Sequence, residues 1–233
     1  RTRPTEVLVV ADFGEDNTVP VLHRLQAPLP YVRPHRNRLG RGGINAIKAG
    51  FGAATAPFVL VMMADGSDEP EVVDRMLTAA ERGADVVAGS RYMRGGGQIG
   101  GPPLKRTLSR AAGLSLHHLA GVGTHDSPSN FKLYSRRLLD QFVIQSQGGF
   151  ELALELTMKA YRLGMPIAEV PTTWRDRTAG TSRFKPWQGM HRYLRCDGYG
   201  MRARPSAARG PRQLVRYGRP EGAAGGGTEA GGG

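Results

Sequence analysis

Apolar and polar residues occur along the chain in blocks that predict strands and helices in turn. A continuous apolar run over residues 58–63 predicts a strand that is buried on both faces. Further strands are predicted over residues 6–12, 84–92, 131–135 and 167–174, and helices over 19–25, 71–82, 104–119, 136–142 and 150–163. Because strands and helices alternate, we predict an α/β fold with a mostly parallel sheet flanked by helices.

Segments rich in Gly and Pro separate these elements. Residues 28–33 are punctuated by proline and are expected at the edge of the sheet. A Gly-rich turn at 38–43 leads into a helix that reaches about residue 51; it either cradles a phosphate on its backbone N–H groups or is purely structural. Residues 93–103 are expected to form a loop, as are the charged residues 175–185, and a helix is expected at 187–195.

The apolar run at 58–63 ends in an acidic loop that contains Asp65, Ser67, Asp68 and Glu69. In an open α/β sheet, ligands bind beyond the carboxyl ends of the strands. Carboxylates in such a place suit Mg²⁺ or Mn²⁺ carrying a phosphate. The alternative is an acidic helix start, with Ser67 or Asp68 as the N-cap. The two interpretations are compatible, because Asp65 can bind a metal while its neighbours cap a helix.

Composition limits the class of protein. The chain has 233 residues, enough for one sizeable domain, which we place at residues 1–197, followed by a disordered Arg/Gly-rich tail at 198–233. Of the net charge of +12, residues 183–233 contribute +7, from ten basic residues against three acidic ones. The single cysteine, Cys196, excludes an internal disulfide framework and a cysteine-based metal site. No apolar run approaches the roughly 20 residues of a membrane-spanning helix.

Five segments of the chain together resemble those of a known enzyme family. They are residues 9–18, 62–70, 89–92, 127–134 and 169–183. In order and in spacing they resemble the GT-A glycosyltransferases of family 2, especially the dolichyl- and polyprenyl-phosphate mannosyltransferases. The resemblance implies a GT-A fold and transfer of a sugar, with inversion, from a nucleoside diphosphate donor to a polyprenyl phosphate. It also implies a Mg²⁺ or Mn²⁺ cofactor, GDP-mannose as the donor, and a peripheral position on the cytoplasmic face of a membrane, without nucleic acid as a partner.

Two features depart from this family. The family's metal loop reads Asp-x-Asp, and Met63 stands where the first Asp would be, which leaves Asp65 as the principal ligand and Asp68 or Glu69 to compensate. The family's first strand, which carries a nucleotide-gripping loop, is not in this sequence, which does not begin with Met. We therefore expect an N-terminally truncated catalytic domain with a gap in its sheet and exposed apolar surface beside it.

The resemblance also implies roles for individual residues. The catalytic residues would be Asp65 on the metal, Arg177 on the donor diphosphate, and Arg91 and Lys105 on the acceptor phosphate. The remaining donor-binding residues would be Asp12, Ser182 and Arg183, and the remaining acceptor-binding residues Ser109 and Asp126. Catalysis of this reaction would depend mainly on positioning the substrates and neutralising charge, because the leaving group is a diphosphate and the nucleophile is already anionic.

Simpler interpretations stand beside these roles. Arg91 could serve only to pair with an acid such as Asp126, and Asp12 could cap the following turn. The cation at Lys105 opposes the dipole of its helix start, which favours a phosphate partner. The His117–His118 pair points to different faces of a helix and is not expected to bind metal. Glu151 and Glu155 share one helix face and are expected to be solvated.

Two other functional classes compete with a glycosyltransferase. A nucleotidyltransferase would also present a Gly-rich turn and an acidic strand end. A non-enzymatic basic module would bind anionic lipid or nucleic acid through its arginines. The tail has only Tyr199 and Tyr217 as aromatic residues among its cations, which favours a membrane surface over stacked bases.

Overall fold

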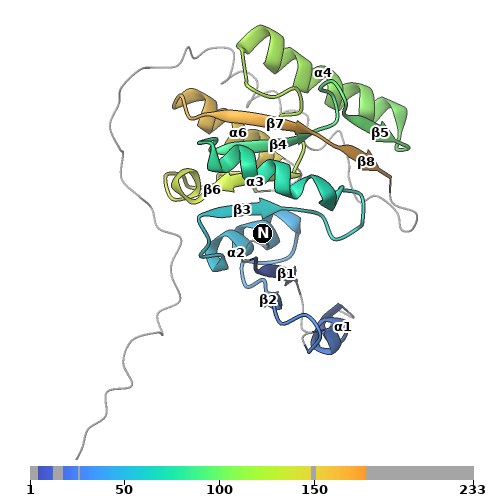
Figure 1. Ribbon diagram of the computed structural model, residues 1–233, viewed down its shortest axis with the longest axis vertical. Helices are drawn as coiled ribbons and strands as arrows, with labels where there is room; N and C mark the ends of the chain where they lie inside the picture. Colours follow the sequence, from blue (N-terminus) through green and yellow to red (C-terminus); the bar gives the residue numbers. More distant parts are fainter. Residues whose placement is uncertain (1–4, 13–17, 26, 148–150, 177–233) are drawn as a thin grey trace, which may run out of the picture.

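The computed structural model describes residues 5–12, 18–25, 27–147 and 151–176. The strands are β1 (Val7–Ala11), β2 (Val32–Arg36), β3 (Phe58–Val61), β4 (Val86–Ser90), β5 (Gly97–Ile99), β6 (Lys132–Ser135), β7 (Ile167–Pro171) and β8 (Thr173–Arg175). The helices are α1 (Thr18–Leu25), α2 (Gly43–Ala53), the short 3-10 helix η1 (Pro70–Val72), α3 (Val73–Glu81), α4 (Pro103–Ala120), α5 (Arg136–Leu139) and α6 (Glu151–Arg162). Strands and helices alternate along most of the chain, which confirms the predicted α/β class (Figure 1).

A four-stranded sheet in the order β3-β6-β4-β7 forms the centre of the fold (Figure 1). β4 and β7 are parallel, whereas β6 runs antiparallel to both of its neighbours, β3 and β4. β3, β4 and β7 therefore share one direction, as predicted for a mostly parallel sheet, and β6 is the exception. The carboxyl ends of these three strands lie at one edge of the sheet, where the acidic loop follows β3 and Arg91 follows β4.

Two smaller sheets flank the central one. β1 and β2 form a parallel pair, and no described strand joins this pair to β3, which agrees with the gap expected there. β5 and β8 form a second parallel pair, in which Gly97 lies opposite Thr173. The prediction of an irregular loop over 93–103 was therefore wrong at residues 97–99. The single strand predicted over 167–174 is divided at Thr172 into β7 and β8.

The two faces of the central sheet are covered by different helices. Val86 of β4 and Tyr134 of β6 pack with α2 and α6 on one face. The adjacent residues Val87 and Leu133 pack with α3 on the other face, because side chains alternate along a strand. Every residue of β4 is buried, which explains why its sequence is apolar without alternation.

α4 lies at one edge of the molecule (Figure 1) and is anchored through its C-terminal half. Leu116 packs with Leu154 and Met158 of α6. Gly113 allows a close approach to the following chain, since a Cβ there would lie 2.2 Å from the backbone oxygen of His125. α4 therefore fixes the segment that leads to Asp126.

Several predictions fall outside the described residues. They concern the charged loop beyond Asp176, the helix at 187–195 and the tail at 198–233. Among the described helices, none combines the length and the apolar character that crossing a bilayer requires.

Candidate active site

The acidic loop after β3 is shaped by its own side chains. Asp65 Oδ1 accepts hydrogen bonds from the backbone N–H of Ser67 at 3.2 Å and from its hydroxyl at 2.6 Å. Asp68 Oδ2 accepts from the backbone N–H of Met63 at 3.1 Å. The residue that caps η1 is Glu69, and its side chain makes no capping hydrogen bond. The interpretation of Ser67 or Asp68 as the N-cap was therefore wrong, because both side chains belong to the loop itself.

Burial and several neighbouring charges act on the pKa of Asp68. Burial raises the pKa of Asp68 to about 6 against the hydrogen bond from Met63, and the negative charge of Asp65 adds to the rise. The charges of Arg91 and Asp126 also act on this pKa, in opposite directions. The acidic loop, the end of β4 and the loop at Asp126 therefore lie within electrostatic range of one another.

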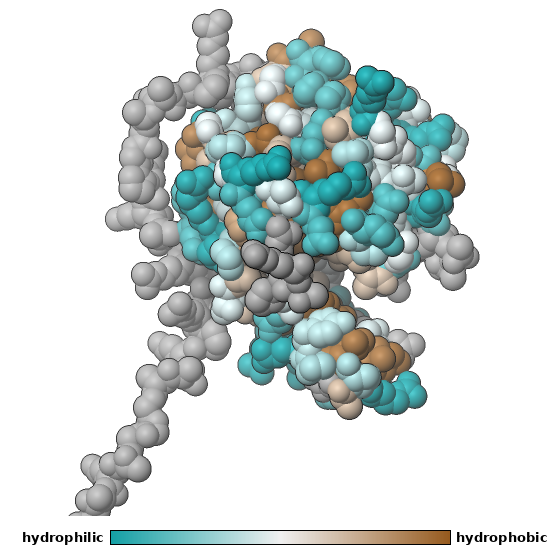
Figure 2. All heavy atoms as spheres, in the orientation of Figure 1, coloured by the Kyte–Doolittle hydropathy of each residue, from teal (hydrophilic) through white to brown (hydrophobic). Residues whose placement is uncertain are grey.

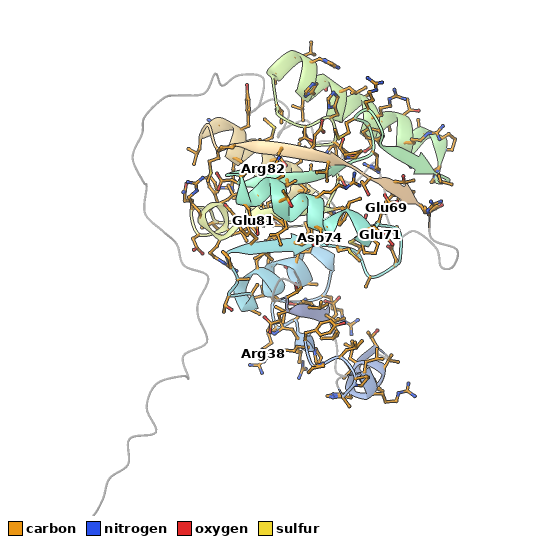
Figure 3. The ribbon with its side chains drawn as sticks, in the orientation of Figure 1. Arg38, Glu69, Glu71, Asp74, Glu81 and Arg82 are labelled. Carbon is orange, nitrogen blue, oxygen red and sulfur yellow. The ribbon has the colours of Figure 1, made fainter. Side chains whose placement is uncertain are left out.

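Glu69 connects the acidic loop to β8. Its Oε2 accepts the backbone N–H of Thr173 at 2.9 Å, and the backbone N–H of Arg175 donates to the oxygen of Ser67 at 3.0 Å. Figure 3 shows Glu69 and Glu71 on the segment that follows β3, at the same end of the molecule as β8. Glu69 thus binds the backbone of β8, whereas Asp65 and Asp68 accept hydrogen bonds from within the acidic loop itself.

Arg91 directly follows β4 and is held by a bidentate ion pair. Its Nε and Nη2 donate to the two carboxylate oxygens of Asp126 at 2.7 and 2.8 Å. Nη2 also lies 3.2 Å from the Ser109 hydroxyl on α4, and the guanidinium carbon lies 4.8 Å from the centre of the Tyr92 ring. Within the part of the chain that the structure describes, Nη1 has no hydrogen-bond partner, so this side of the guanidinium can face a ligand.

The ion pair fixes the charge of Arg91. Burial alone would lower the pKa of Arg91, but hydrogen bonds and charge attraction from Asp126 raise it above its ordinary value. The Arg91 side chain is 14% exposed and that of Asp126 is 0% exposed. Asp126 therefore cannot reach a ligand directly, and its contribution is to hold the guanidinium in one position.

The loop that carries Asp126 is organised by a buried lysine. Lys132 of β6 is completely buried, and its Nζ donates to the backbone oxygens of Asp126 at 3.0 Å, Ser127 at 2.9 Å and Ser129. Burial lowers the pKa of Lys132 to about 7, and the charge of Asp126 partly opposes this effect. Three carbonyl acceptors match the three donors of a charged ammonium group.

The structure describes some of the other predicted site residues and not others. Ser109 contacts Arg91 directly. Lys105 lies in the first turn of α4, and its side chain lies outside what the structure describes, as do Arg177, Ser182 and Arg183. The described chain ends at Asp176, whose N–H donates to Ile99 O at 2.9 Å.

Asp12 directly follows β1 and accepts hydrogen bonds from two residues of the segment after β2. Its oxygens accept from the side-chain amide of Asn37 at 2.8 Å and from the backbone N–H of Gly42 at 2.9 Å. Asp12 and Asn37 also line a cavity of about 490 Å³ together with three arginines, of which Arg38 is marked in Figure 3. The lining residues are Asp12, Arg36, Asn37, Arg38, Gly40 and Arg41. This positive cavity fits an anionic ligand, with Asp12 organising its wall.

The sequence patterns did not reveal the roles of several buried charged residues, at the site and elsewhere. Lys132 appeared as an ordinary strand residue, and Asp68 was interpreted either as a helix cap or as a compensating metal ligand. Glu155 was expected to be solvated and is 7% exposed, because the segment before α6 folds back and places the N–H groups of Gln145 and Ser146 at 2.7 Å from its oxygens. Glu151 is 5% exposed, so the expectation of a solvated pair was wrong for both.

The two neighbouring histidines make different contacts. His117 stacks on His125, with ring centres 3.7 Å apart, and His118 is exposed. His125 pairs with Glu169, with Nδ1 and Oε1 2.6 Å apart. Among the described residues, no group of three or more His, Cys, Asp or Glu is arranged to hold a metal.

Sequence comparisons identify related proteins. The sequence model of the family described as Glycosyl transferase family 2 matches residues 2–143. A polyprenol monophosphomannose synthase of Mycolicibacterium smegmatis is 32% identical over 210 residues, which cover 88% of this chain and 79% of that protein. An undecaprenyl-phosphate mannosyltransferase of Micrococcus luteus is 36% identical over 188 residues, which cover 77% of this chain and 75% of that protein.

Solved structures support the fold. A glucosyl-3-phosphoglycerate synthase from Mycobacterium tuberculosis, bound to Mn²⁺, UDP and glucosyl-3-phosphoglycerate, has a TM-score of 0.54 and 20% identity, covering 82% of this chain and 65% of that chain. A structure of this synthase with Mn²⁺, UDP-glucose and phosphoglyceric acid has a TM-score of 0.58 and 18% identity, covering 82% and 68%. These likenesses confirm the predicted GT-A fold. The chain spans about two thirds of the length of these synthases.

Proposed function

Because the chain belongs to glycosyl transferase family 2, we propose that it transfers mannose from a nucleotide sugar to a polyprenyl phosphate. Two relatives above 30% identity are named for polyprenyl-phosphate mannosylation, and the chain covers 79% and 75% of them. Within this activity, GDP-mannose is the donor and the membrane surface supplies the acceptor.

One observation carries this assignment: a fixed cation and a pair of carboxylates share one site. Arg91 is locked by Asp126 beside the acidic loop, and its charge acts on Asp68. An acceptor phosphate needs a positioned cation rather than a strong base, because its oxygen is already anionic. A diphosphate leaving group needs positive charge where its bond breaks.

The acidic loop fits a divalent cation with few protein ligands. Mg²⁺ is usually bound by one or two carboxylates together with substrate phosphates. The hydrogen bond from Met63 brings Asp68 beside the position where the family's first Asp would stand. We therefore assign Asp65 and Asp68 as the ligands of Mg²⁺ or Mn²⁺, while Glu69 holds β8. When bound, the metal supplies positive charge to the donor diphosphate.

In the proposed reaction, an oxygen of the polyprenyl phosphate forms a bond with the anomeric carbon of mannose. The bond from that carbon to the diphosphate breaks, its electron pair leaves with the nucleoside diphosphate, and the configuration inverts. Nη1 of Arg91 faces the acceptor phosphate, with Lys105 and Ser109 beside it. Asp126 holds the Arg91 guanidinium in one orientation. In the same scheme the donor diphosphate is contacted by Arg177, Ser182 and Arg183, and the nucleoside by the wall that Asp12 organises.

The metal assignment is tested with Asp65→Asn and, as a matched control, Asp74→Asn, which changes an exposed acid on α3. Transfer of labelled mannose from GDP-mannose to a polyprenyl phosphate is measured against Mn²⁺ concentration. We expect Asp65→Asn to raise the Mn²⁺ concentration required and to lower kcat/KM about 100-fold or more, and Asp74→Asn to leave both unchanged. Unchanged Mn²⁺ dependence in Asp65→Asn would contradict the assignment.

The donor is tested separately with a panel of nucleotide sugars. GDP-mannose is expected to give the highest kcat/KM. A higher value with UDP-glucose would replace the donor while keeping the reaction class. No transfer from any sugar to a polyprenyl phosphate, by a chain that binds Mn²⁺, would contradict the proposed function.

A further inference from the structure

Glu169 of β7 holds three polar groups of the segment that leads to Asp126. Its Oε2 accepts the backbone N–H of His125 at 2.9 Å and the Thr124 hydroxyl at 3.1 Å. Its Oε1 lies 2.6 Å from Nδ1 of His125, which is the donor because an ionised carboxylate only accepts. The side chains of Glu169 and His125 are 12% and 26% exposed, so these contacts are largely shielded from water.

The Thr124 hydroxyl extends this contact to Asp126. It donates to Glu169 and also accepts the backbone N–H of Asp126 at 3.1 Å. Thr124 and Asp126 are both 0% exposed, so water cannot replace a lost partner there unless the fold opens. A chain of hydrogen bonds therefore runs from Glu169 through Thr124 to Asp126. The Asp126 carboxylate continues this chain to Arg91.

Adjacent strands fix the two halves of the Arg91–Asp126 ion pair. β4 and β7 are parallel, with Ala88 opposite Glu169, and Arg91 directly follows β4. Figure 1 shows these two strands side by side, with α4 beyond β7. β4 thus sets the position of the cation, and Glu169 on β7 sets the position of its counter-charge.

Glu169 and Lys132 hold opposite polar groups of the same loop. Lys132 donates to three backbone oxygens between residues 126 and 129, whereas Glu169 accepts N–H and O–H groups of residues 124 and 125. Burial lowers the pKa of Lys132, and the charge of Glu169 is one of those that oppose this effect. The two side chains therefore lie within electrostatic range of each other, on either side of Asp126.

Glu169 also lines a surface cavity of about 720 Å³ between α3 and β7. Charged side chains line this cavity from α3, and Asp74 and Arg82 among them are marked in Figure 3. Figure 2 shows mostly hydrophilic surface on this side of the molecule, with apolar surface between. A ligand of the cavity would be an alternative partner for Glu169, but its hydrogen bonds are made with residues 124 and 125 instead.

We propose that Glu169 is a positioning residue of the acceptor site, which holds Asp126, and through it the guanidinium of Arg91, in place for the acceptor phosphate. This inference rests on the proposed function, since Arg91 is the cation that would bind the polyprenyl phosphate. Glu169 acts through backbone and hydroxyl groups and needs no contact with a substrate. A displacement of about 1 Å at a catalytic group can cost roughly 100-fold in rate, so loss of this anchor should be visible in catalysis.

Three variants of the full chain separate positioning from a general loss of packing. Glu169→Ala removes the anchor. Glu169→Gln keeps it, because the amide oxygen can accept the same groups while its NH₂ faces Nδ1 of His125, which accepts in its other tautomer. Glu155→Ala is the matched control, since Glu155 of α6 is 7% exposed and also accepts two backbone N–H groups, from Gln145 and Ser146 at 2.7 Å.

Transfer of mannose is measured at a temperature at which each variant is folded, as checked by urea unfolding. We expect Glu169→Ala to lower kcat/KM for the polyprenyl phosphate about 100-fold, without a change in the KM for the nucleotide sugar. Glu169→Gln should stay close to wild type, and Glu155→Ala should lose stability but keep its kcat/KM. A wild-type kcat/KM in Glu169→Ala would overturn the proposal, as would an equal loss in Glu155→Ala.

Thr124→Val tests the same chain of hydrogen bonds if Glu169→Ala does not fold. Valine has a similar shape but cannot accept the N–H of Asp126. We expect kcat/KM for the polyprenyl phosphate to fall about tenfold, as the loss of one hydrogen bond predicts. An unchanged value would show that Asp126 does not depend on this link, and the proposal would fail.

A measurement without turnover separates this inference from the proposed function. Nε–H of Arg91 donates to Asp126 at 2.7 Å, and its resonance is identified by its loss in Arg91→Lys. Its hydrogen exchange with solvent should be about tenfold faster or more in Glu169→Ala, and unchanged in Glu155→Ala. If wild type transfers no mannose but Glu169→Ala speeds this exchange, the activity is wrong and the positioning role stands. If wild type transfers mannose and the exchange is equal in both, the activity stands and the positioning role is wrong.

Discussion

Replacing Asp126 with asparagine tests whether the ion pair with Arg91 is part of the active site. Asp126 is fully buried and receives two guanidinium hydrogen bonds at 2.7 and 2.8 Å. Asn is almost the same size, so the change removes one negative charge and turns one acceptor into a donor that faces Arg91. The guanidinium is then left nearly buried without its counter-charge.

The expected loss of stability follows from this burial. Breaking a buried pair by neutralising one partner costs about 3–5 kcal/mol, because the remaining charge is uncompensated. The Arg91 side chain, at 14% exposed, can regain only part of its hydration without leaving the site. We expect the free energy of unfolding, measured by urea titration, to fall by about 3–5 kcal/mol.

Activity should fall in the molecules that remain folded. Without Asp126 the guanidinium is no longer held in one orientation, and a displacement of about 1 Å can cost roughly 100-fold in rate. We therefore expect kcat/KM for the polyprenyl phosphate to fall about 100-fold, equivalent to about 2.7 kcal/mol of transition-state stabilisation. The KM for the nucleotide sugar should change little.

Asp85→Asn is the matched control. Asp85 is 2% exposed and is also held by an arginine, since Nε of Arg137 lies 3.0 Å from its Oδ1. The Arg137 side chain is 64% exposed and can turn to water, so we expect a smaller loss of about 1–3 kcal/mol and normal kcat/KM. If Asp126→Asn is destabilised while its kcat/KM stays at the wild-type value, the ion pair is structural only and the acceptor role of Arg91 fails.

Three further changes test the packing around the site. Gly113→Ala should lower the free energy of unfolding by about 1–3 kcal/mol, because the added Cβ would lie 2.2 Å from the backbone oxygen of His125. Equal stability of the variant and wild type in urea would show that α4 can move away. Tyr134→Phe should raise that free energy by about 1 kcal/mol, since the buried hydroxyl has no hydrogen-bond partner among the described residues; a loss would point to a partner outside them. Burial lowers the pKa of Lys132 to about 7. Between pH 7 and the unfolded-state pKa of about 10.4, the unfolded chain therefore binds more protons than the folded one. Stability should then rise with pH by up to about 1.4 kcal/mol per unit, and Lys132→Met should remove this slope in urea titrations at pH 7, 8 and 9.

The sequence predicted best those elements whose pattern is local. The continuous apolar run of β3 and the helical spacing of α3 and α6 are set by residues close together in the chain. β5 was missed because it has three residues, begins with a glycine, and pairs with β8 far along the chain, as Gly97 with Thr173. The reversed direction of β6 was likewise invisible, because strand direction depends on how the connections cross the sheet.

The sequence predicted which residues lie near the site, but not which side chains contact one another there. The spacing placed Asp65 and Arg91 at strand ends, and the fold brings such ends together at one edge. The pairing of Arg91 with Asp126 stood as the simpler alternative to an acceptor role, and the structure contains that pair. Among the described residues, Nη1 of the same guanidinium has no hydrogen-bond partner. Lys132 was not recognised because its importance comes from three carbonyls on a loop that only the folded chain places around it.

The departure at Met63 has a structural consequence that spacing alone could not resolve. A loop with one carboxylate fewer would hold a cation weakly, unless another acid took the vacant position. Asp68 and Glu69 were equal candidates in the sequence. Glu69 accepts a hydrogen bond from the backbone of β8, whereas Asp68 accepts one from the backbone N–H of Met63. We therefore expect the second carboxylate ligand to come from Asp68 in the loop instead of from the strand end, which would keep two acids in the proposed site with Arg91.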